Sequence, residues 1–350
     1  DYWLTQAIRL ADAQCERQEL SGRFRWAGHE DDRFSSLVHN ALADCALIDL
    51  AGELKSCEQP GRVNRYLNVA RKNLDGYIIK HLYRPELEGF TMNPVDHYAN
   101  RDRFIVNMNS VAIEAMTKLD LQTESNEYAA LVHTVSQKMF SLQSKEGAGK
   151  GSLPYSHAES GLHISLYSAL ALRSLPTLKE YCDSTSLTDM ANGALSFLDR
   201  MEDEKTGLWF HKIENEQPTH YPIFVAGAGM ICNGILDASR ISGTEIDELS
   251  LASKLLSYQY PGGGIRNFIG YNHPDNGRWE GDGKECWEDV YPSPNWNAQA
   301  FHFLSRVLPP PERPEQSGGV LIYNNSRRFV YFENSRISCV AGTWPPRRWT

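Results

Sequence analysis

A structural unit recurs along this chain, and this repeat restricts the fold more than any other feature of the sequence. Each copy has an amphipathic helical pattern, a Gly-containing turn with an aromatic residue, a polar loop, and a second, more apolar helical pattern. The copies follow one another at intervals of roughly 55 to 70 residues. The turns are centred on Phe24, Phe90, Tyr155, Trp209 and Phe268, and the second helices start near Arg33, Arg103, His163, Ile223 and Trp296.

The two helices of the repeat differ in composition, and this difference predicts where each lies. The second helices, such as HISLYSALALRSL and IFVAGAGMICNGIL, are rich in Ala, Gly, Ser and Leu, so neighbouring copies can approach closely. The first helices, such as RYLNVARKNLDGYIIKHL, carry charge on one face, as expected of an outer layer. We therefore predict an all-α protein, an α/α toroid of five to six helix pairs. An open solenoid is the alternative, and only a closed ring brings the loops together around one cavity.

The repeats extend over residues 1–308, and the sequence changes character after them. A Pro-rich linker, PPPERPEQ, follows, and residues 317–350 contain GVLIYNNSRRFVYFENSRISCV, in which apolar and polar residues alternate. This alternation predicts a short C-terminal β-hairpin. We expect residues 1–350 to form a single domain, with the hairpin and tail packed on the toroid.

Composition excludes several classes of function. The formal net charge is -9 and the pI is about 5.7, and no Lys/Arg cluster dominates, so we expect no nucleic-acid partner. No apolar run of about 18 residues occurs, and no signal peptide is visible. The chain opens at Asp1, so loss of a leader is compatible with the sequence. The seven cysteines are scattered and form no CxxC pair, which favours a reducing compartment and a cytoplasmic location.

Polar residues that are able to move protons gather in the loops before the second helices. Asp32 and Asp102 immediately precede helices, where a carboxylate also serves as an N-cap. The second loop contains His97, the third Glu159 and His163, and the fourth His211, His220 and Tyr221. No HxH or HExxH spacing occurs, so we expect neither a metal nor another cofactor.

Aromatic residues share these loops with the acids. Each of them fits either a hydrophobic core or the wall of a cavity, where aromatic faces stabilise carbocations or stack on sugar rings. The candidate substrate-binding residues are Trp209, Phe224, Tyr221, Trp287, Trp296 and Tyr155.

The turns LLSYQYPGGGIRNF and FSLQSKEGAGKGSLPY look like degenerate Gln-Trp repeats, which mark the squalene-hopene cyclase and prenyltransferase toroids. The resemblance covers most of residues 1–308. It implies a single-toroid version of a class II terpene cyclase, a family in which the middle Asp of an Asp-x-Asp-Asp motif protonates an alkene or epoxide. Asn100-Arg101-Asp102-Arg103 keeps only that middle acid, and His29-Glu30-Asp31-Asp32 is a weaker match. Arginines beside Asp102 would favour its charged form, unless they point away from the cavity.

On this resemblance, the chain is predicted to be a terpene or meroterpenoid cyclase, an isomerase-type enzyme in which Asp102 is the general acid. Asp32, His97, Glu159 and His163 are its possible acid/base partners. The substrate would be a small hydrophobic molecule, and peripheral contact with a membrane would be compatible with it.

Two other functions remain open from the sequence. The first is a carbohydrate-active toroid: a polysaccharide lyase, uronate epimerase or glycoside hydrolase. A lyase would draw on His157, His163, Tyr155, Tyr221, Arg101 and Asn107, and a hydrolase would pair Asp102 with Asp32 or Glu159. The second is a catalytically inactive binding scaffold.

Overall fold

A computed structural model describes residues 2–24, 36–57, 59–94, 103–260, 263–270 and 292–308, together with short strands at 332–333 and 338–339. The described part is mainly helical, as the sequence predicts. In chain order, the α-helices are α1 (Tyr2–Glu16), α2 (Leu37–Lys55), α3 (Pro60–Asn73), α4 (Val106–Thr123), α5 (Ala129–Ser141), α6 (Ser165–Ala171), α7 (Ser184–Arg200), α8 (Ala228–Ser242), α9 (Glu248–Leu256) and α11 (Pro294–Val307). A π-helix, η1 (Leu74–Leu82), extends α3, and the short 3-10 helices are η2 (Pro85–Leu87), η3 (Leu172–Ser174) and η4 (Thr177–Glu180).

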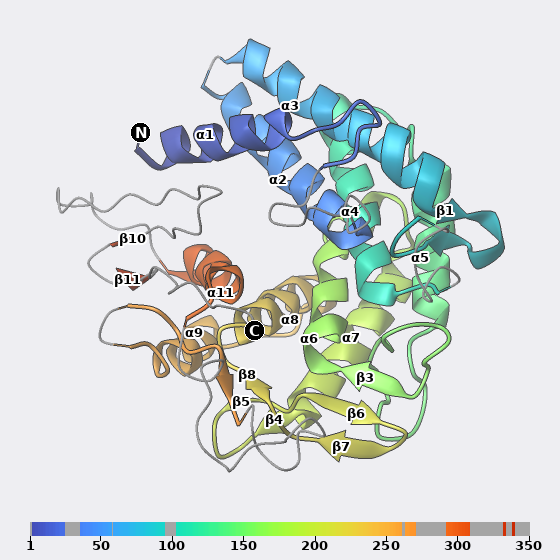
Figure 1. Ribbon diagram of the computed structural model, residues 1–350. Coiled ribbons are helices and arrows are strands. Elements are labelled where there is room, and N and C mark those ends of the chain that lie inside the picture. The colour runs from blue at the N-terminus through green and yellow to red at the C-terminus, as the bar shows by residue number, and fades with distance from the viewer. Residues whose placement is uncertain are drawn as a thin grey trace, which may run out of the picture.

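The helices form two concentric layers. The inner helices pack side by side in the order α2, α4, α6, α8 and α11, and each has a partner from the outer set α1, α3, α5, α7 and α9 (Figure 1). The prediction of an α/α toroid is therefore confirmed. Within the described residues the five helix pairs correspond to the five sequence repeats. The second, Ala- and Gly-rich helix of each repeat is the inner one.

Small residues allow the inner helices to approach one another. A Cβ atom added to Gly229 of α8 would lie 2.3 Å from the backbone of Ala300 in α11. A Cβ atom added to Gly234, on another side of α8, would lie 2.5 Å from the backbone of Ala169 in α6. Glycine is therefore required sterically at both contacts, and this explains the small-residue composition from which the inner layer was predicted.

Four of the five inner helices are joined, at or just before their N-terminus, to the loop that precedes the next inner helix. The backbone N–H of Leu37 donates to the carbonyl of Met92 at 2.8 Å, and the N–H of Val106 donates to the carbonyl of Tyr155 at 3.1 Å. The same connection recurs farther along the chain, with donor and acceptor pairs Ser165 and His211 (3.1 Å) and Val225 and Asn267 (2.8 Å). These bonds satisfy N–H groups that a helix start leaves without partners. They also gather the loops at one end of the ring.

A buried asparagine holds the aromatic turn of three repeats against its own inner helix. The side chain of Asn109 accepts from the N–H of Phe90 at 2.7 Å and donates to the carbonyls of Phe90 and Ile105. In the first repeat Asn40 accepts from the N–H of Phe24 and donates to the carbonyl of Ser36. In the fifth, Asn297 makes all three bonds, to the N–H and carbonyl of Ile265 and to the carbonyl of Ser293. In the third repeat, Ser168 donates to the carbonyl of Leu153. The spacing from turn to helix is thereby fixed by side chains as well as by the backbone.

Short strands lie at the N-terminal ends of the inner helices. The largest sheet has the antiparallel order β3-β6-β7, formed by β3 (Leu162–Ile164), β6 (Lys212–Glu214) and β7 (Gln217–Thr219). Three two-stranded sheets pair β1 (Tyr83–Arg84) with β2 (Gly89–Phe90), β4 (Glu202–Asp203) with β5 (Leu208–Trp209), and β8 (Ile223–Phe224) with β9 (Phe268–Ile269).

Near the C-terminus, β10 (Phe332–Glu333) pairs antiparallel with β11 (Ser338–Cys339), the pairing expected of the predicted hairpin. The packing of this segment on the toroid, and the assignment of residues 1–350 to one domain, remain predictions. Among the residues described, no helix combines the length and the apolar character needed to cross a membrane.

Candidate active site

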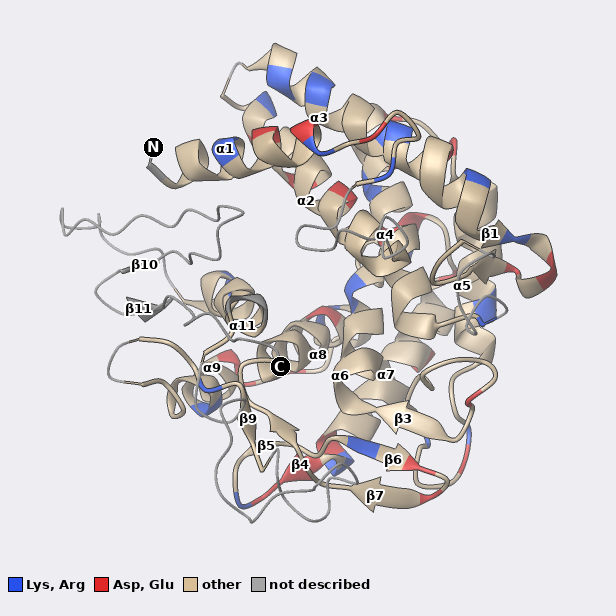
Figure 2. Cartoon of the chain, viewed as in Figure 1, with Lys and Arg blue, Asp and Glu red and all other residues tan. Residues whose placement is uncertain are grey.

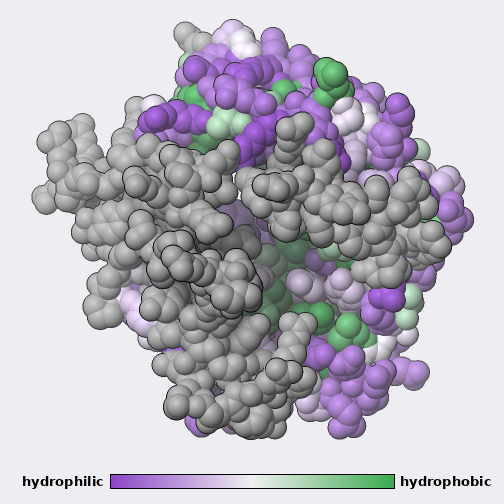
Figure 3. All heavy atoms as spheres, in the orientation of Figure 1, coloured by the Kyte–Doolittle hydropathy of each residue, from purple (hydrophilic) through white to green (hydrophobic). Residues whose placement is uncertain are grey.

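The N-terminal ends of the inner helices and the loops before them surround the centre of one face of the toroid. We call this region the mouth and define it by residues 103–108, 155–167, 210–211, 220–230, 266–270 and 293–296. Figure 3 shows this face of the molecule, with a hollow at its centre where apolar side chains are visible between the grey residues. The hollow agrees with the expectation that a closed ring brings its loops around a common cavity.

Glu159 is the one carboxylate among the described residues of the mouth. One of its oxygens lies 3.0 Å from Nη1 of Arg103, and the other accepts a hydrogen bond from Oγ of Ser156 at 2.9 Å. About a third of each charged side chain is exposed. An isolated antiparallel bridge between Ile105 and Ser156 brings the two loops together and thereby aligns Arg103 with Glu159. The arrangement orients a carboxylate that remains accessible to a ligand.

His157 lies beside this pair. Its ring accepts a hydrogen bond at Nδ1 from the backbone N–H of Phe104 at 3.0 Å, and its own N–H donates to the carbonyl of Phe104. A ring that accepts at Nδ1 carries its proton on Nε2 when it is neutral. His157 is therefore held in one tautomer, with Nε2 as a donor.

Two tyrosines form an aromatic wall next to the carboxylate. The ring centroids of Tyr155, in the loop, and Tyr167, on α6, are 5.7 Å apart. Burial raises the pKa of the Tyr155 phenol, and the neighbouring Tyr167 and Glu159 raise it further against the opposing charge of Arg103. Tyr155 is therefore protonated at neutral pH and is suited to hydrogen bonding and stacking.

His211 connects the inner helices α6 and α8. Its carbonyl accepts from the N–H of Ser165 at the start of α6, and its N–H donates to the carbonyl of His220. Its ring centroid lies 5.2 Å from that of Phe224, just before α8. The imidazole is half-buried. The backbone of His211 is therefore fixed on both sides, and its ring lies against Phe224.

A second aromatic group lies at the starts of α8 and α11. Phe224 makes edge-on contacts with Phe268 and Trp296 at centroid distances of 4.8 and 5.4 Å. The backbone of Gly227 lies beneath the indole of Trp296, since a Cβ atom there would sit 3.0 Å from the ring. These three rings form a second apolar wall at the mouth.

A stacked pair lies next to this second wall. The rings of Phe210 and His220 are nearly parallel, with centroids 4.0 Å apart, and His220 is exposed. The pair offers a flat surface on the rim of the mouth.

The predicted site residues are divided between the mouth and other positions. Glu159, Tyr155, Phe224 and Trp296 lie together at the mouth, and Tyr221 joins them with its ring against Gly270. Four more of the predicted site residues lie outside the described part of the chain: Asp32, His97, Asp102 and Trp287.

His163 and Trp209 are buried instead, each in contact with a side chain of an outer helix. His163 is 3 % exposed, hydrogen-bonds through Nδ1 to Oγ of Ser152 at 2.6 Å, and contacts the ring of Phe197 on the outer helix α7. Trp209 is 3 % exposed and lies under Nζ of Lys254 from the outer helix α9, 5.6 Å from its ring centroid. Their roles as acid/base partner and substrate contact remain untested predictions.

Sequence reasoning gave no role to several residues of the mouth. It named His211 among the polar residues of the fourth loop but did not select it, and it did not single out Tyr167. A signal for Tyr167 was present, because it is the one aromatic residue in the small-residue pattern HISLYSALALRSL. Among the described residues, no cluster of three or more His, Cys, Asp or Glu side chains could hold a metal ion.

Comparison with known proteins identifies relatives of the fold. No protein-family model matches the sequence, and no curated protein matches it significantly. Endoglucanase Cel10 from Klebsiella pneumoniae, a family 8 glycosyl hydrolase, matches with a TM-score of 0.59 at 10% identity over 89% of this chain and 94% of that one.

Two further solved structures extend this similarity. D-mannose isomerase matches with a TM-score of 0.59 at 10% identity, over 87% of each chain. Cellobiose 2-epimerase from Bacillus thermoamylovorans matches with a TM-score of 0.54 at 10% identity, over 97% of this chain and 95% of that one. At such low identity, these matches establish the α/α toroid fold of the chain and no particular reaction.

The prediction of a terpene cyclase is wrong. The toroids that resemble this chain in structure bear the names of glycoside hydrolases and of sugar epimerases and isomerases, and these relatives favour the carbohydrate-active alternative. The error arose from the Gly-aromatic turns. Those turns reflect the geometry of a helix pair in a toroid, which enzymes of unrelated chemistry share. The hydrophobic substrate and the role of Asp102 as donor to an alkene depended on that resemblance and lose their support with it.

Proposed function

We propose that this chain is a carbohydrate-active enzyme whose active site is the mouth of the toroid. The observation that carries the proposal is the combination of proton-transfer groups and aromatic walls at one end of the ring. Glu159 and His157 share the loop of Tyr155, whose ring contacts Tyr167, and His211 contacts Phe224 of the Phe224–Phe268–Trp296 group. Sugar rings bind to aromatic faces through their C–H groups, and polar residues beside those faces orient the hydroxyls.

The residue types favour proton transfer at a sugar carbon, as in an epimerase or isomerase. Such a reaction needs a base that removes a proton next to a carbonyl and an acid that returns it, and histidine suits both tasks near neutral pH. Apart from the buried His163, the described mouth contains His157, His211 and His220, but only one carboxylate, Glu159. In this proposal His211 exchanges the proton, and Glu159, oriented by Arg103, binds sugar hydroxyls.

Glycoside hydrolysis is the second candidate. It requires two carboxylates at a defined separation, about 5 to 10 Å depending on the stereochemical outcome. Glu159 could be one of them, and Asp32 and Asp102 are the candidates for the other. The similarity to the family 8 endoglucanase fold is compatible with this reaction.

One set of incubations separates the two reactions. The protein is incubated with mannose, glucose, cellobiose and cello-oligosaccharides, and products are followed by NMR in D₂O and by release of reducing ends. Epimerisation or isomerisation incorporates deuterium at the carbon that exchanges its proton, whereas hydrolysis shortens the chain without such exchange. His211→Ala is expected to reduce turnover at least 100-fold, while Glu214→Gln, an exposed position on β6, leaves it unchanged. Turnover in His211→Ala equal to the wild-type value would refute the assignment of this residue.

A further inference from the structure

A second group of charged residues lies inside the ring, on the C-terminal halves of the inner helices. We call it the floor cluster and define it as Glu114, Lys118, Arg173, Asp237, His302 and Arg306. Figure 2 shows Lys, Arg, Asp and Glu of the described residues on the outer helices and loops, and also on α4 and α8 near the centre of the ring. The floor cluster is separate from the mouth, which lies at the N-terminal ends of the same helices.

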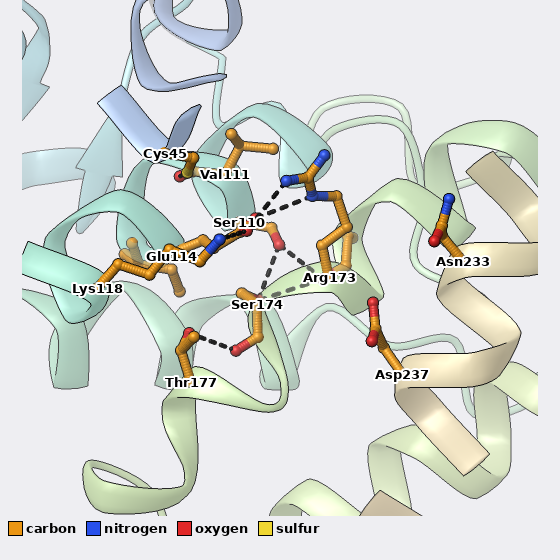
Figure 4. Close-up of polar contacts among 12 residues, drawn as sticks. Cys45, Ser110, Val111, Glu114, Lys118, Arg173, Ser174, Thr177, Asn233 and Asp237 are labelled. Carbon is orange, nitrogen blue, oxygen red and sulfur yellow. Dashed lines mark hydrogen bonds and ion pairs between the residues drawn. The ribbon is translucent and has the colours of Figure 1, made fainter. Parts of the chain in front are cut away.

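Glu114 is the centre of the first half of the cluster. Its carboxylate lies 3.0 Å from both Nε and Nη2 of Arg173 and 2.9 Å from Nζ of Lys118, and its side chain is only 3 % exposed (Figure 4). Burial by itself would raise the pKa of Glu114, but the charges and hydrogen bonds of Arg173 and Lys118 together outweigh it and lower the pKa to about 2. The carboxylate is therefore ionised at any physiological pH.

Arg306 is the centre of the second half. Its guanidinium lies 2.5 Å from Oδ1 of Asp237 and donates to Oδ1 of Asn233 at 2.8 Å, both on α8. In Figure 4 Asn233 and Asp237 lie on the α8 side of Arg173. Groups from α4, η3, α8 and α11 thus meet inside the ring.

His302 lies on α11 one helical turn before Arg306, so the two side chains share one face of that helix. The side chain of His302 is exposed to solvent, although enough protein surrounds it for burial to be the largest cause of a pKa lowered to about 4. His302 is therefore within reach of solvent although the cationic side chains of the cluster lie near it. The charges of Arg173, Arg306 and Lys118 lower the pKa of His302 further, and Glu114 opposes them.

The balance of charge around His302 is positive. Three cations, Lys118, Arg173 and Arg306, face two buried carboxylates, Glu114 and Asp237. The third acid in contact with the group, Asp49, pairs with Lys118 but is 57 % exposed, so solvent screens its charge. Positive potential at a site that solvent can reach attracts small anions, and burial around it strengthens the attraction.

We propose that His302, Arg173 and Arg306 form a binding site for the carboxylate or phosphate group of a small sugar derivative at the floor of the toroid. An anion there would balance the excess positive charge and would accept a hydrogen bond from the imidazole. Its charge would also favour protonation of His302, so binding is coupled to uptake of a proton at mildly acidic pH. The identification of the ligand as a sugar rests on the proposed function, whereas the anion site itself does not.

Binding is measured directly, without reference to turnover. The probes are glucuronate, glucose 6-phosphate and inorganic phosphate, with glucose as the uncharged control, and affinities are measured by calorimetry at pH 5.5 and pH 7.5. We expect at least one of the two anionic sugars to bind, with weaker affinity at pH 7.5, and glucose not to bind at the floor. The pKa of His302, followed by NMR, should rise by at least one unit when the anion is present.

His302→Ala and His133→Ala form a matched pair of variants, because both histidines are exposed on helices and His133 lies on the outer helix α5. We expect His302→Ala to weaken anion binding at least 10-fold and His133→Ala to leave it unchanged. Equal affinities in the two variants, or no shift of the His302 pKa with any of the anions, would overturn the proposal. Loss of turnover in His211→Ala is a separate result, so failure at the floor and failure at the mouth are distinguishable.

Discussion

Glu114 offers the sharpest test of how the inner ring is held together. Its carboxylate is almost fully buried and contacts Lys118 and Arg173, which come from α4 and from the end of the next inner helix segment. Glu114→Gln keeps the size and shape of the side chain but removes the negative charge. Two cations then remain in a poorly solvated environment with only an amide as partner, so the folded state loses stability.

The expected loss of stability follows from the burial of Glu114, and the fall in the thermal midpoint follows from the length of the chain. Removing one partner of a buried ion pair costs about 3 to 5 kcal/mol. A chain of 350 residues unfolds with an entropy of about 0.7 kcal/mol/K near its midpoint. The thermal midpoint of Glu114→Gln should therefore fall by about 5 °C, as measured by differential scanning calorimetry at pH 7.

The pH dependence gives the same test a second readout. The pKa of Glu114 is about 2 in the folded protein, against an ordinary value of 4.5. Its stabilising effect is therefore fully present above pH 4.5 and is lost as the pH falls from 4.5 toward 2, a difference of about 3 kcal/mol. The stability difference between the wild type and Glu114→Gln should shrink over that range.

Glu127→Gln is the matched control, since Glu127 pairs with Arg71 at the surface and is about half exposed. It should change stability by less than about 1 kcal/mol. A midpoint for Glu114→Gln within 1 °C of the control, or a stability difference that does not depend on pH below 4.5, would refute the reasoning.

Three further predictions test the packing of the ring and the mouth. Asn109→Ala should destabilise the protein by about 2 kcal/mol, because the buried N–H of Phe90 loses its acceptor; chemical denaturation measures this, and an unchanged midpoint would disprove the role of the asparagine. Gly229→Ala should lower the free energy of unfolding by about 1 to 3 kcal/mol, because the new methyl group clashes with α11. Gly61→Ala, in open space on α3, is the control and should leave the stability unchanged or raise it by up to about 1 kcal/mol. The opposite order of stability would contradict the close approach of α8 and α11. If the Glu159 carboxylate binds sugar hydroxyls, Glu159→Gln should raise KM for the sugar by a larger factor than it lowers kcat. A fall in kcat with KM unchanged would instead make Glu159 a proton donor.

The toroid itself was predictable from sequence because its cause is local and periodic. Small residues recur in every second helix and charged faces in every first one, so the inner and outer layers could be assigned without any knowledge of contacts. The aromatic turns marked the ends of the repeats for the same reason. The sequence also identified the loops that meet at one end of the ring, and therefore the region of the candidate site.

The orientation of side chains within those loops required the tertiary structure. His163 and His157 belong to the same loop, yet His163 turns toward Ser152 and the outer helix α7, whereas His157 stays beside Glu159 at the mouth. His163 is placed by the pairing of β3 with β6, opposite Ile213, whereas His157 lies before β3 and is held by its hydrogen bonds to Phe104. A local pattern does not encode that register.

The floor cluster could be recognised only in the tertiary structure. Glu114 is 59 residues from Arg173 in sequence, and Asp237 is 69 residues from Arg306. In the sequence each of them is a single charge on a helix, indistinguishable from a solvated one. They meet only because the ring places successive inner helices side by side. The sequence alone therefore determined the repeat and the two layers, which follow from local composition. The chemistry of the mouth and of the floor was decided by contacts between repeats, which exist only once the ring has formed.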